Sequence, residues 1–315
     1  MKGGIPTTSK ITIGVPIGCR TDEAVTRPIV RELEKRDRFN VDVIDLVPGD
    51  SDLTARCVLQ HINTGNARAV LPPGIDFMLC VADRTEMLVA AAVAHASGIP
   101  IGHVYAGTGS NVATLDDLSR HAITMLSEIQ FCESKQASGR VEAMMMMAGL
   151  KANVHVVGIT HLDDLEIDHD GVPKEKYTLV LYNPLTSGPD LAKRVTSEID
   201  EILRLLGDDK EVYLIGSNPD HFPEGTTTAC ERLLERSDTY DPSLPRPKFL
   251  GLLEGCDRFL TNSSAGIYEA PVLMTGRRDR IVMIGERNRD RDRGPFETGA
   301  SKKIADILEA HLAPQ

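Results

Sequence analysis

The chain of 315 residues has no tryptophan, and aromatic residues make up only 4% of it. Its cores must therefore be built from Val, Ile, Leu, Ala and Met. Basic residues are also outnumbered, because 35 Lys and Arg against 46 Asp and Glu leave a net charge of −11. This balance argues against general nucleic-acid binding, which needs a basic surface. It is compatible with a small anionic ligand held in a local pocket.

Cysteines are few and scattered, with no C-x-x-C pair and no histidine at zinc-site spacing. We therefore expect reduced, mostly buried thiols, no metal centre and no dissociable redox cofactor. No long apolar segment precedes the first predicted strand, and no stretch suggests a signal peptide or a membrane span. These features predict a cytoplasmic protein without a membrane partner. The cysteines are Cys19, Cys57, Cys80, Cys132, Cys230 and Cys256.

Short apolar runs alternate with helical patterns along the chain, which is typical of βαβ units and a parallel sheet. Strands are predicted at residues 10–18, 40–47, 76–82, 99–105, 129–134, 154–158, 177–184, 211–217, 257–263 and 280–285. Helices are predicted at residues 22–36, 85–98, 115–127, 140–150, 190–207, 225–237, 244–256, 265–276 and 301–312. We interpret the run Met144–Met147 as core packing on one of these helices.

The alternation pauses at the polar, acidic stretch 163–176, which we interpret as a linker. A chain of this length is too long for one typical core. The sequence therefore predicts an α/β fold of two Rossmann-like doubly wound domains, residues 1–165 and residues 166–315. Ligands of such folds bind at the carboxyl ends of the strands, and the expected site is a cleft between the two domains.

Polar clusters follow several predicted strands of the first domain. "GCRTDE" contains Arg20, which suits a phosphate, although Thr21 or Asp22 could simply cap a helix. "VADRTE" contains Asp83, and capping is again the alternative. "HVYAGTGS" contains His103, which in isolation is more typical of a hydrogen-bonded core histidine. Its glycines permit close approach of the backbone to a ligand.

Two stretches of the second domain have the same ambiguity. "FLTNSSAGIYEAP" runs from a strand into a helical pattern, so Asn262, Ser263 and Ser264 can either cap a helix or bind phosphate at its first turn. "GERNRDRDRGP" is a dense mixed-charge run of the kind usually found in a solvated loop. Directly after a buried strand it could equally be an arginine-rich loop beside a bound phosphate.

The order of these motifs carries a resemblance to a known family. "GCRTD", "ADRTE", "GIPIGHVYAGTGS", "DDLSRHAITMLS", "NSSAGIYEAP" and "MIGERNRDR" follow one another as in the UDP-N-acetylglucosamine 2-epimerase family, and most closely as in its hydrolysing branch. The resemblance covers nearly the whole chain. It implies two Rossmann-like domains of the GT-B type with a nucleotide sugar between them, no cofactor, and assembly into a homodimer or homotetramer.

The resemblance also implies roles for particular residues. The family reaction resembles elimination of UDP across C1–C2 of the sugar and rehydration of the glycal, with Asp83 and Asp116 matching two catalytic carboxylates. Ser263, Ser264 and Glu269 match positions that hold the diphosphate and ribose, and Glu269 could accept bonds from ribose hydroxyls. The remaining positions that the resemblance assigns to substrate binding are Arg20, His103, Arg120, His121, Asn183, Asn218 and Arg287.

Three positions depart from the family pattern. Tyr105 stands in place of a catalytic glutamate, Asn183 in place of a histidine, and Met125 in place of a lysine. A phenol with a pKa near 10 is a poor base at neutral pH, and an asparagine does not transfer protons. Tyr105 is nevertheless a candidate substitute in the catalytic site, facing the cleft. Three functions fit: an altered epimerase or hydrolase, a non-catalytic nucleotide-sugar-binding paralogue, or a glycosyltransferase on the same architecture.

Overall fold

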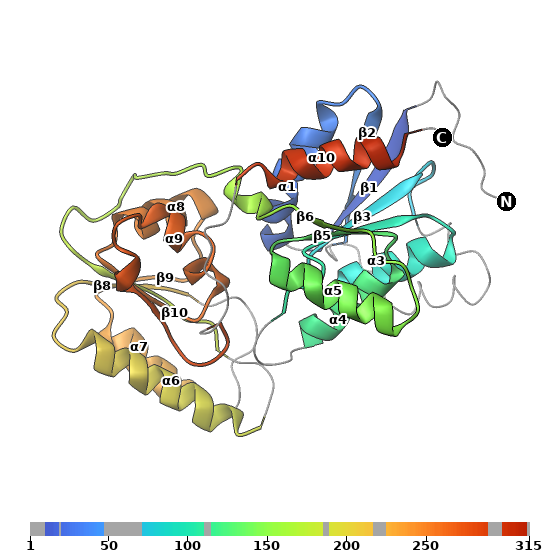
Figure 1. Ribbon diagram of the computed structural model, residues 1–315. Helices are drawn as coiled ribbons and strands as arrows, with labels where there is room; N and C mark the ends of the chain where they lie inside the picture. Colours follow the sequence, from blue (N-terminus) through green and yellow to red (C-terminus); the bar gives the residue numbers. More distant parts are fainter. Residues whose placement is uncertain are drawn as a thin grey trace. The chain divides into compact units, whose positions relative to one another are not determined.

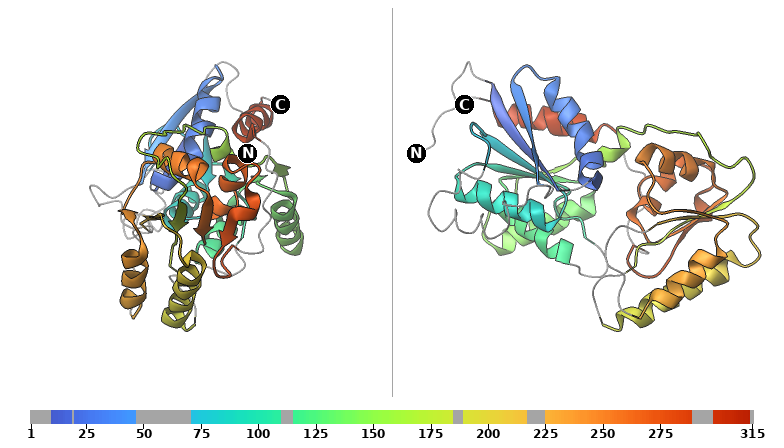
Figure 2. Two further views of the ribbon diagram at one scale, coloured as in Figure 1. Left: turned by 90° about the vertical axis from the view of Figure 1, so that its left-hand side faces the viewer. Right: turned by 180° about the vertical axis from the view of Figure 1, so that it is seen from behind.

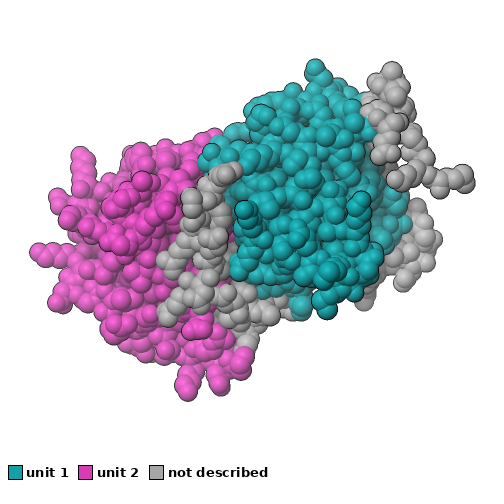
Figure 3. Space-filling view, in the orientation of Figure 1, with its two compact units in different colours: residues 1–109, 113–164, 297–315 teal, residues 110–112, 165–296 magenta. Residues whose placement is uncertain are grey.

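The computed structural model of the protein describes residues 10–18, 20–46, 71–109, 115–184, 189–216, 225–288 and 298–313, without the side chains of residues 20–24 and 115–116. Two compact units are distinguished in Figure 3. The first consists mainly of residues up to 164 together with the C-terminal residues 297–315. The second consists mainly of residues 165–296. Each unit is built around its own parallel sheet, which confirms the α/β prediction.

The first unit contains a six-stranded parallel sheet with the order β2-β1-β3-β4-β5-β6. Its strands are β1 (Ile11–Ile17), β2 (Phe39–Asp45), β3 (Phe77–Val81), β4 (Ile101–Val104), β5 (Ile129–Cys132) and β6 (Val154–Val156). Its helices are α1 (Arg20–Glu34), α3 (Thr85–Ala96), α4 (Leu115–Leu126), α5 (Lys135–Met147), the 3-10 turn η2 (Thr160–Leu162) and α10 (Ala300–His311). Helices α1 and α10 lie together on one face, and α3, α4 and α5 cover the other (Figures 1 and 2).

The second unit contains a five-stranded parallel sheet with the order β11-β10-β7-β8-β9. Its strands are β7 (Thr178–Leu181), β8 (Val212–Ile215), β9 (Thr239–Asp241), β10 (Arg258–Thr261) and β11 (Ile281–Met283). Its helices are α6 (Leu191–Leu206), α7 (Thr227–Arg236), α8 (Arg246–Gly255) and α9 (Ala270–Leu273), with 3-10 turns η3 (Ser264–Gly266) and η4 (Arg278–Arg280). Helices α6 and α7 lie on one face, and α8 and α9 lie on the other (Figure 1).

Each sheet has one place where the strand order reverses. In the first sheet this switch point lies between β1 and β3, and in the second it lies between β7 and β10. Connections leave neighbouring strands toward opposite faces at such a point, so a crevice opens outside their carboxyl ends. The polar motifs after residues 17, 81, 181 and 261 all follow these four strands. The fold therefore puts those predicted residues that follow these strands, Asp83, Asn183 and Ser263 among them, at the edge where α/β proteins bind ligands.

The cores are aliphatic, as the lack of aromatic residues requires. One apolar cluster of the first unit lies between its sheet and helices α3 and α4. Five of its large members are at most 1% exposed: Ile75, Met78, Met87, Ile101 and Ile123. The four-methionine run is only partly core, because Met145 is buried while Met146 and Met147 are 74% and 86% exposed. The prediction that the run packs in a core is thus wrong for its last two residues. A helix one side of which faces water can bury only part of any four consecutive side chains.

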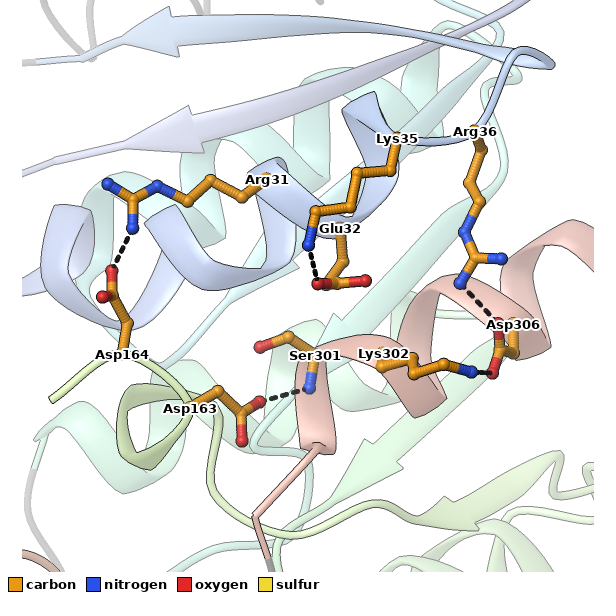
Figure 4. A network of polar contacts seen from close by, with 9 residues as sticks. All are labelled: Arg31, Glu32, Lys35, Arg36, Asp163, Asp164, Ser301, Lys302 and Asp306. Atoms are coloured by element: carbon orange, nitrogen blue, oxygen red, sulfur yellow. Dashed lines mark hydrogen bonds and ion pairs between the residues drawn. The ribbon is translucent and has the colours of Figure 1, made fainter.

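The C-terminal helix corrects the predicted division of the chain. The main run of the first unit extends to residue 164, and α10, which was assigned to the second domain, lies in the first unit. Asp163 accepts hydrogen bonds from the backbone N–H groups of Gly299 and Ser301, and so caps the start of α10. Figure 4 shows the bond to Ser301. Arg36 on the loop after α1 pairs with Asp306 on α10. These partners are more than a hundred residues apart in sequence, so no local pattern announces them.

The structure differs from the predicted elements in two further places, an omitted strand and a helix that is broken. β9 was not predicted, because "TYD" is short and forms an exposed edge of the second sheet. The helix predicted at residues 265–276 is instead the turn η3 followed by the four-residue α9. Pro271 explains part of the break, because a proline is tolerated only in the first turn of a helix. The motif "NSSAGIYEAP" is therefore a compact turn and not a long helix.

Candidate functional site

The carboxyl end of β3 presents an ion pair. Ala82, directly after the strand, has a φ of 70°, and Asp83 follows it. The Asp83 carboxylate pairs with the guanidinium of Arg120, which comes from α4. Both side chains are largely buried, with 20% and 11% of their surface exposed. A carboxylate and a guanidinium predicted to act on the same ligand are therefore brought together at the first switch point.

His103 lies beneath this pair, inside the first unit. It is fully buried on β4, with its Nε2 2.8 Å from the carbonyl oxygen of Ala82 and its Nδ1 3.0 Å from the Thr124 hydroxyl. Burial lowers the pKa of His103 to about 4, so the ring is neutral at physiological pH. Both ring nitrogens are engaged within the protein, which favours the core-histidine interpretation over direct contact with a ligand.

Tyr105 is also turned into the unit. Its side chain is only 7% exposed, and its φ of 65° places it in the left-handed region. The hydroxyl lies 2.9 Å from Thr160 Oγ1 and 3.0 Å from His161 Nδ1, and it accepts a 3.1 Å bond from the Thr160 N–H. Burial raises the pKa of Tyr105 well above its usual value. This placement argues against Tyr105 as a proton-transfer residue that faces a ligand.

His121 is the neighbour of Arg120 on α4 and is partly exposed. Its pKa is lowered, first by burial, and the positive charges of Arg120 and Arg140 add to the effect while Asp117 opposes it. Its Nδ1 makes no hydrogen bond within the described part of the protein. This nitrogen is enclosed by the protein, so any contact of His121 with a ligand would be made by the rest of its partly exposed ring.

Three predicted residues lie outside the description. The side chains of Arg20 and Asp116 fall among those that the structure does not describe, although α1 begins at Arg20 and α4 carries Asp116. Asn218 lies in the undescribed segment after β8. Their assignments remain predictions.

In the second unit Asn262 ties together the strand ends of its switch point. Its Oδ1 accepts a 2.8 Å bond from the Asn183 N–H, and its Nδ2 donates a 2.7 Å bond to the Asn183 carbonyl. The carbonyl of Asn262 accepts a 2.7 Å bond from Nδ2 of Asn288, which follows β11. Both asparagine side chains are at least 97% buried. Asn262 is therefore a structural clamp, and it fixes the loop of Asn183, one of the predicted binding residues.

The serines that follow lie at the surface of this clamp. Ser263 begins η3, and its Oγ accepts a 3.3 Å bond from the Ala265 N–H, which leaves its hydroxyl proton available to a ligand. Ser264 is exposed. Gly266 allows the turn to pack closely against the ends of β10 and β11. A Cβ at this position would lie only 2.6 Å from Met283 Sδ and 2.7 Å from Thr261 Cγ2. Capping and ligand contact are thus compatible, and the alternatives posed by the sequence do not exclude one another.

Two charged residues complete the second cluster. Glu269 is 91% buried, and its Oε1 lies 3.5 Å from a guanidinium nitrogen of Arg246 on α8. Arg287 follows β11, and its positive charge opposes the increase that burial causes in the pKa of Glu198 and Tyr182. An anionic ligand near Arg287 would therefore meet a cation that is already part of a buried polar cluster.

The comparisons with known proteins give the chain its family. The family model described as UDP-N-acetylglucosamine 2-epimerase matches residues 37–312, which is most of the chain. The chain belongs to the UDP-N-acetylglucosamine 2-epimerase family. The clusters around Asp83 and Ser263 are thus the strand-end clusters of an epimerase-family protein.

Curated relatives in the epimerase family match over part of their length. A UDP-N-acetylglucosamine 2-epimerase of Neisseria meningitidis is 30% identical over 62% of this chain and 53% of its own. A hydrolysing UDP-N,N'-diacetylbacillosamine 2-epimerase of Legionella pneumophila is 26% identical over 69% of this chain and 58% of its own. The match thus spans little more than half the length of these curated relatives.

Solved structures extend the likeness of fold. The UDP-GlcNAc 2-epimerase of Methanocaldococcus jannaschii, determined with UDP-GlcNAc and UDP, has a TM-score of 0.69 at 17% identity and covers 95% of this chain and 100% of its own. The Neisseria meningitidis enzyme bound to UDP-GlcNAc has a TM-score of 0.66 at 15% identity and covers 96% and 100%. The fold is therefore that of the epimerase family, GT-B-like, with two parallel sheets.

Sequence reasoning missed several residues that hold the predicted site residues in place. Thr160 and His161 bind the Tyr105 hydroxyl, Asn288 supports Asn262, and Arg246 pairs with Glu269. Asn288 was within reach of prediction, because it lies three residues after the end of a predicted strand. The other three come from elements distant in sequence, so that only the fold reveals them.

Other kinds of site are not evident in the described ranges. No group of three or more His, Cys, Asp or Glu residues that could hold a metal ion occurs within them. Cys80, Cys132, Cys230 and Cys256 carry free thiols, while Cys19 and Cys57 lie outside the description. Burial raises the pKa of the Cys80 thiol to about 12, so it is inert at neutral pH. Among the helices described, none has the length and apolar character needed to cross a membrane.

Proposed function

We propose that this protein is an enzyme that acts on a UDP-linked sugar by elimination and hydrolysis at C1–C2, with release of UDP. The observation that carries the proposal is the placement of a charged cluster, Asp83 with Arg120, at the switch point of one parallel sheet of an epimerase-family chain. The names of the relatives, some of which are hydrolysing 2-epimerases, support the reaction class.

The second unit would hold the nucleotide. The Ser263 hydroxyl keeps its proton for a phosphate oxygen, Ser264 is exposed beside it, and Arg287 supplies positive charge. Charge-assisted bonds of this kind stabilise a diphosphate more strongly as negative charge develops on it. Glu269 would accept bonds from ribose hydroxyls, with Arg246 fixing its carboxylate.

The first unit would carry the proton transfers. In the proposed elimination a base removes the C2 proton, its electron pair forms the C1–C2 double bond, and the C1–O bond breaks so that UDP leaves. Water then adds across the glycal, with hydroxyl at C1 and a proton at the opposite face of C2, which inverts that carbon. Asp83 is the described carboxylate proposed for one of these steps, held by Arg120. Asp116 is proposed for the second.

The proposal is tested by incubating the protein with UDP-N-acetylglucosamine and following phosphorus NMR. We expect the two phosphorus signals of UDP-N-acetylglucosamine to be replaced by the two signals of free UDP. Asp83→Asn should reduce the rate by 10²–10⁴-fold, as expected for the loss of a positioned acid or base. Release of UDP at the same rate by Asp83→Asn would contradict the assigned role.

A second function is favoured by one observation, the enclosure of Tyr105. This residue stands where the family has a catalytic carboxylate, and its hydroxyl is engaged by Thr160 and His161. A chain that had lost acid–base catalysis but kept its nucleotide site would be a nucleotide-sugar-binding paralogue. Binding of UDP-N-acetylglucosamine without release of UDP would support this function in place of the enzyme.

Both functions predict that UDP stabilises the protein against heat. A ligand at about 100 times its Kd adds roughly 2.7 kcal/mol to the free energy of unfolding. We expect a rise in Tm with UDP, measured by scanning calorimetry, and a much smaller rise in Arg287→Ala. The matched control is Arg232→Ala, because Arg232 pairs with Asp200 on the exposed surface of the same unit. If no nucleoside diphosphate raised the Tm, the proposed nucleotide site would be contradicted.

A further inference from the structure

We propose that His103 is a positioning residue that fixes Asp83 and Arg120 relative to one another from inside the first unit. His103 touches neither charged side chain in the contacts described above. It reaches each of them through one intermediate residue, Ala82 for Asp83 and Thr124 for Arg120. Its effect on catalysis rests on the proposed function, whereas its effect on the geometry of the ion pair does not.

The bond to Ala82 fixes the start of the path to Asp83. A carbonyl oxygen can only accept, so His103 Nε2 carries the proton of the 2.8 Å bond. Ala82 also donates its own N–H to the Val104 carbonyl at 3.1 Å. Both polar backbone groups of Ala82 are therefore held by consecutive residues of β4. The direction in which Asp83 leaves β3 depends on these two bonds.

Ala82 needs this restraint because its backbone is strained. Its φ of 70° lies in the left-handed region, which is unfavourable for a residue with a Cβ. Such conformations persist where the surroundings fix them, and they gather at functional sites. Without the His103 bond the turn would relax toward an ordinary conformation. The carboxylate of Asp83 would then leave its place opposite Arg120.

The bond to Thr124 fixes the other partner. The Thr124 hydroxyl lies 3.0 Å from His103 Nδ1 and 2.9 Å from the Arg120 carbonyl, one helical turn earlier on α4. In the neutral ring Nδ1 is an acceptor, so the single hydroxyl proton serves two acceptors. Residues four apart on a helix lie on the same face, and Arg120 therefore stands directly above this contact.

The chain offers a matched pair of positions for the test. Thr124 and Ser127 are both buried on the same side of the same segment, and each hydroxyl donates to the carbonyl four residues earlier. Only Thr124 lies within hydrogen-bond distance of His103. Thr124→Val removes the hydroxyl while keeping the shape, and Thr124→Ser restores it. Ser127→Ala is the control for a lost helix back-bond.

The first readout is the kinetics of the full-length protein on UDP-N-acetylglucosamine. We expect Thr124→Val to lower kcat by about 10-fold and to leave KM within twofold of its natural value. A misplaced catalytic group stabilises the transition state less, whereas it leaves binding of the substrate in its ground state unchanged. Thr124→Ser should recover to within threefold of the natural protein, and Ser127→Ala should stay within twofold. Equal losses in Thr124→Val and Ser127→Ala would overturn the proposal.

The second readout needs no activity. Thermal unfolding of Thr124→Val, Asp83→Asn and the double variant forms a double-mutant cycle, and a parallel cycle uses Ser127→Ala. We expect the loss in Tm of the Thr124→Val double variant to be smaller than the sum of the two single losses, and the Ser127→Ala cycle to be additive. Additivity in both cycles would overturn the proposal. If the natural protein releases no UDP, the enzyme proposal fails while this cycle still decides the role of His103.

Discussion

At the residue scale, the site depends on which side chains face inward. His103 and Tyr105 stand two residues apart around the end of β4, and both are turned into the first unit, where they bind partners from other elements. Asp83 lies at the end of the neighbouring strand and keeps 20% of its side chain exposed. Asp83 can therefore meet a ligand, whereas His103 and Tyr105 lie inside the unit and support its structure.

Tyr105 provides the first prediction at this scale. Tyr105→Phe removes the oxygen that accepts the Thr160 N–H, which leaves a buried donor unpaired. We expect a loss of about 1–3 kcal/mol in the free energy of unfolding of the first unit, measured by urea denaturation. Tyr240→Phe is the control, because Tyr240 is 46% exposed. A loss no larger than that of the control would contradict the role given to this hydroxyl.

The same geometry changes what is expected of Tyr105→Glu. From the sequence, this change combined with Asn183→His would be expected to restore family-like activity. In the structure a glutamate at this position would place a carboxylate in a site that is 93% buried, beside Thr160 and His161. A buried charge without a matched partner is costly. We therefore expect Tyr105→Glu to destabilise the first unit before any gain in rate could be measured.

His103 gives a pH dependence with a definite sign. Its folded pKa of about 4 lies below the ordinary value of 6.5, so the unfolded chain binds the proton more readily. The contribution to stability is complete above about pH 6.5 and is lost as the pH falls toward 4. The full loss is on the order of a few kcal/mol.

The measurement is the free energy of unfolding from pH 8 to pH 4, in the natural protein and in His103→Gln. Burial lowers the pKa of His121 and His155 as well, so these residues contribute a slope of the same sign in both proteins. The difference between the two curves isolates His103. Parallel curves across this range would contradict its assignment as a buried neutral ring.

At the element scale, α10 depends on a cap supplied from a remote segment. Asp163 accepts bonds from the N–H groups of Gly299 and Ser301, the second at 2.7 Å. The bond to Ser301 is drawn in Figure 4. We expect Asp163→Ala to cost about 0.5–2 kcal/mol, as the loss of a helix cap does, and to speed amide exchange in the first turn of α10. Hydrogen exchange by mass spectrometry measures both effects.

The control for this prediction lies on the same helix. Asp306 pairs with Lys302 at 2.7 Å and with Arg36, and these side chains are partly exposed. Exposed ion pairs contribute little to stability. Asp306→Ala, which removes these two pairs, should therefore lower the free energy of unfolding by less than about 0.5 kcal/mol. A cap effect no greater than this would argue that α10 is held by apolar packing alone.

At the scale of the whole molecule, the chain leaves the first unit and returns to it at the end. Ile304, Ala305 and Leu308 of α10 are buried there, and α10 packs against α1. We expect removal of residues 298–315 to unfold the first unit, because it would expose to water the apolar surface that these three side chains of α10 cover. The second unit should keep its fold. Limited proteolysis with mass spectrometry distinguishes the two, and a protected first unit would contradict this prediction.

The strands and most helices could be predicted from the sequence because their signals are local. The runs that became β1, β3, β5 and β10 are mostly apolar and largely buried on both faces, which is what a parallel strand between two helical layers requires. Asp83, Ser263 and Arg287 were also accessible, since each follows such a run. β9 and the broken helix after Ser264 were missed, because an exposed three-residue strand and a 3-10 turn leave almost no periodic pattern.

The sequence by itself determined the α/β class, the two sheets, the epimerase-family motifs and the strand ends where polar residues gather. These features depend on neighbours within a few residues, and hydrophobic periodicity reports them directly. Only the tertiary structure decided that α10 completes the first unit, that Asn262 clamps Asn183, and that Tyr105 points inward. Each of these depends on which side chains meet across more than fifty residues of chain. Burial and hydrogen bonding select those partners only when the sheets have formed.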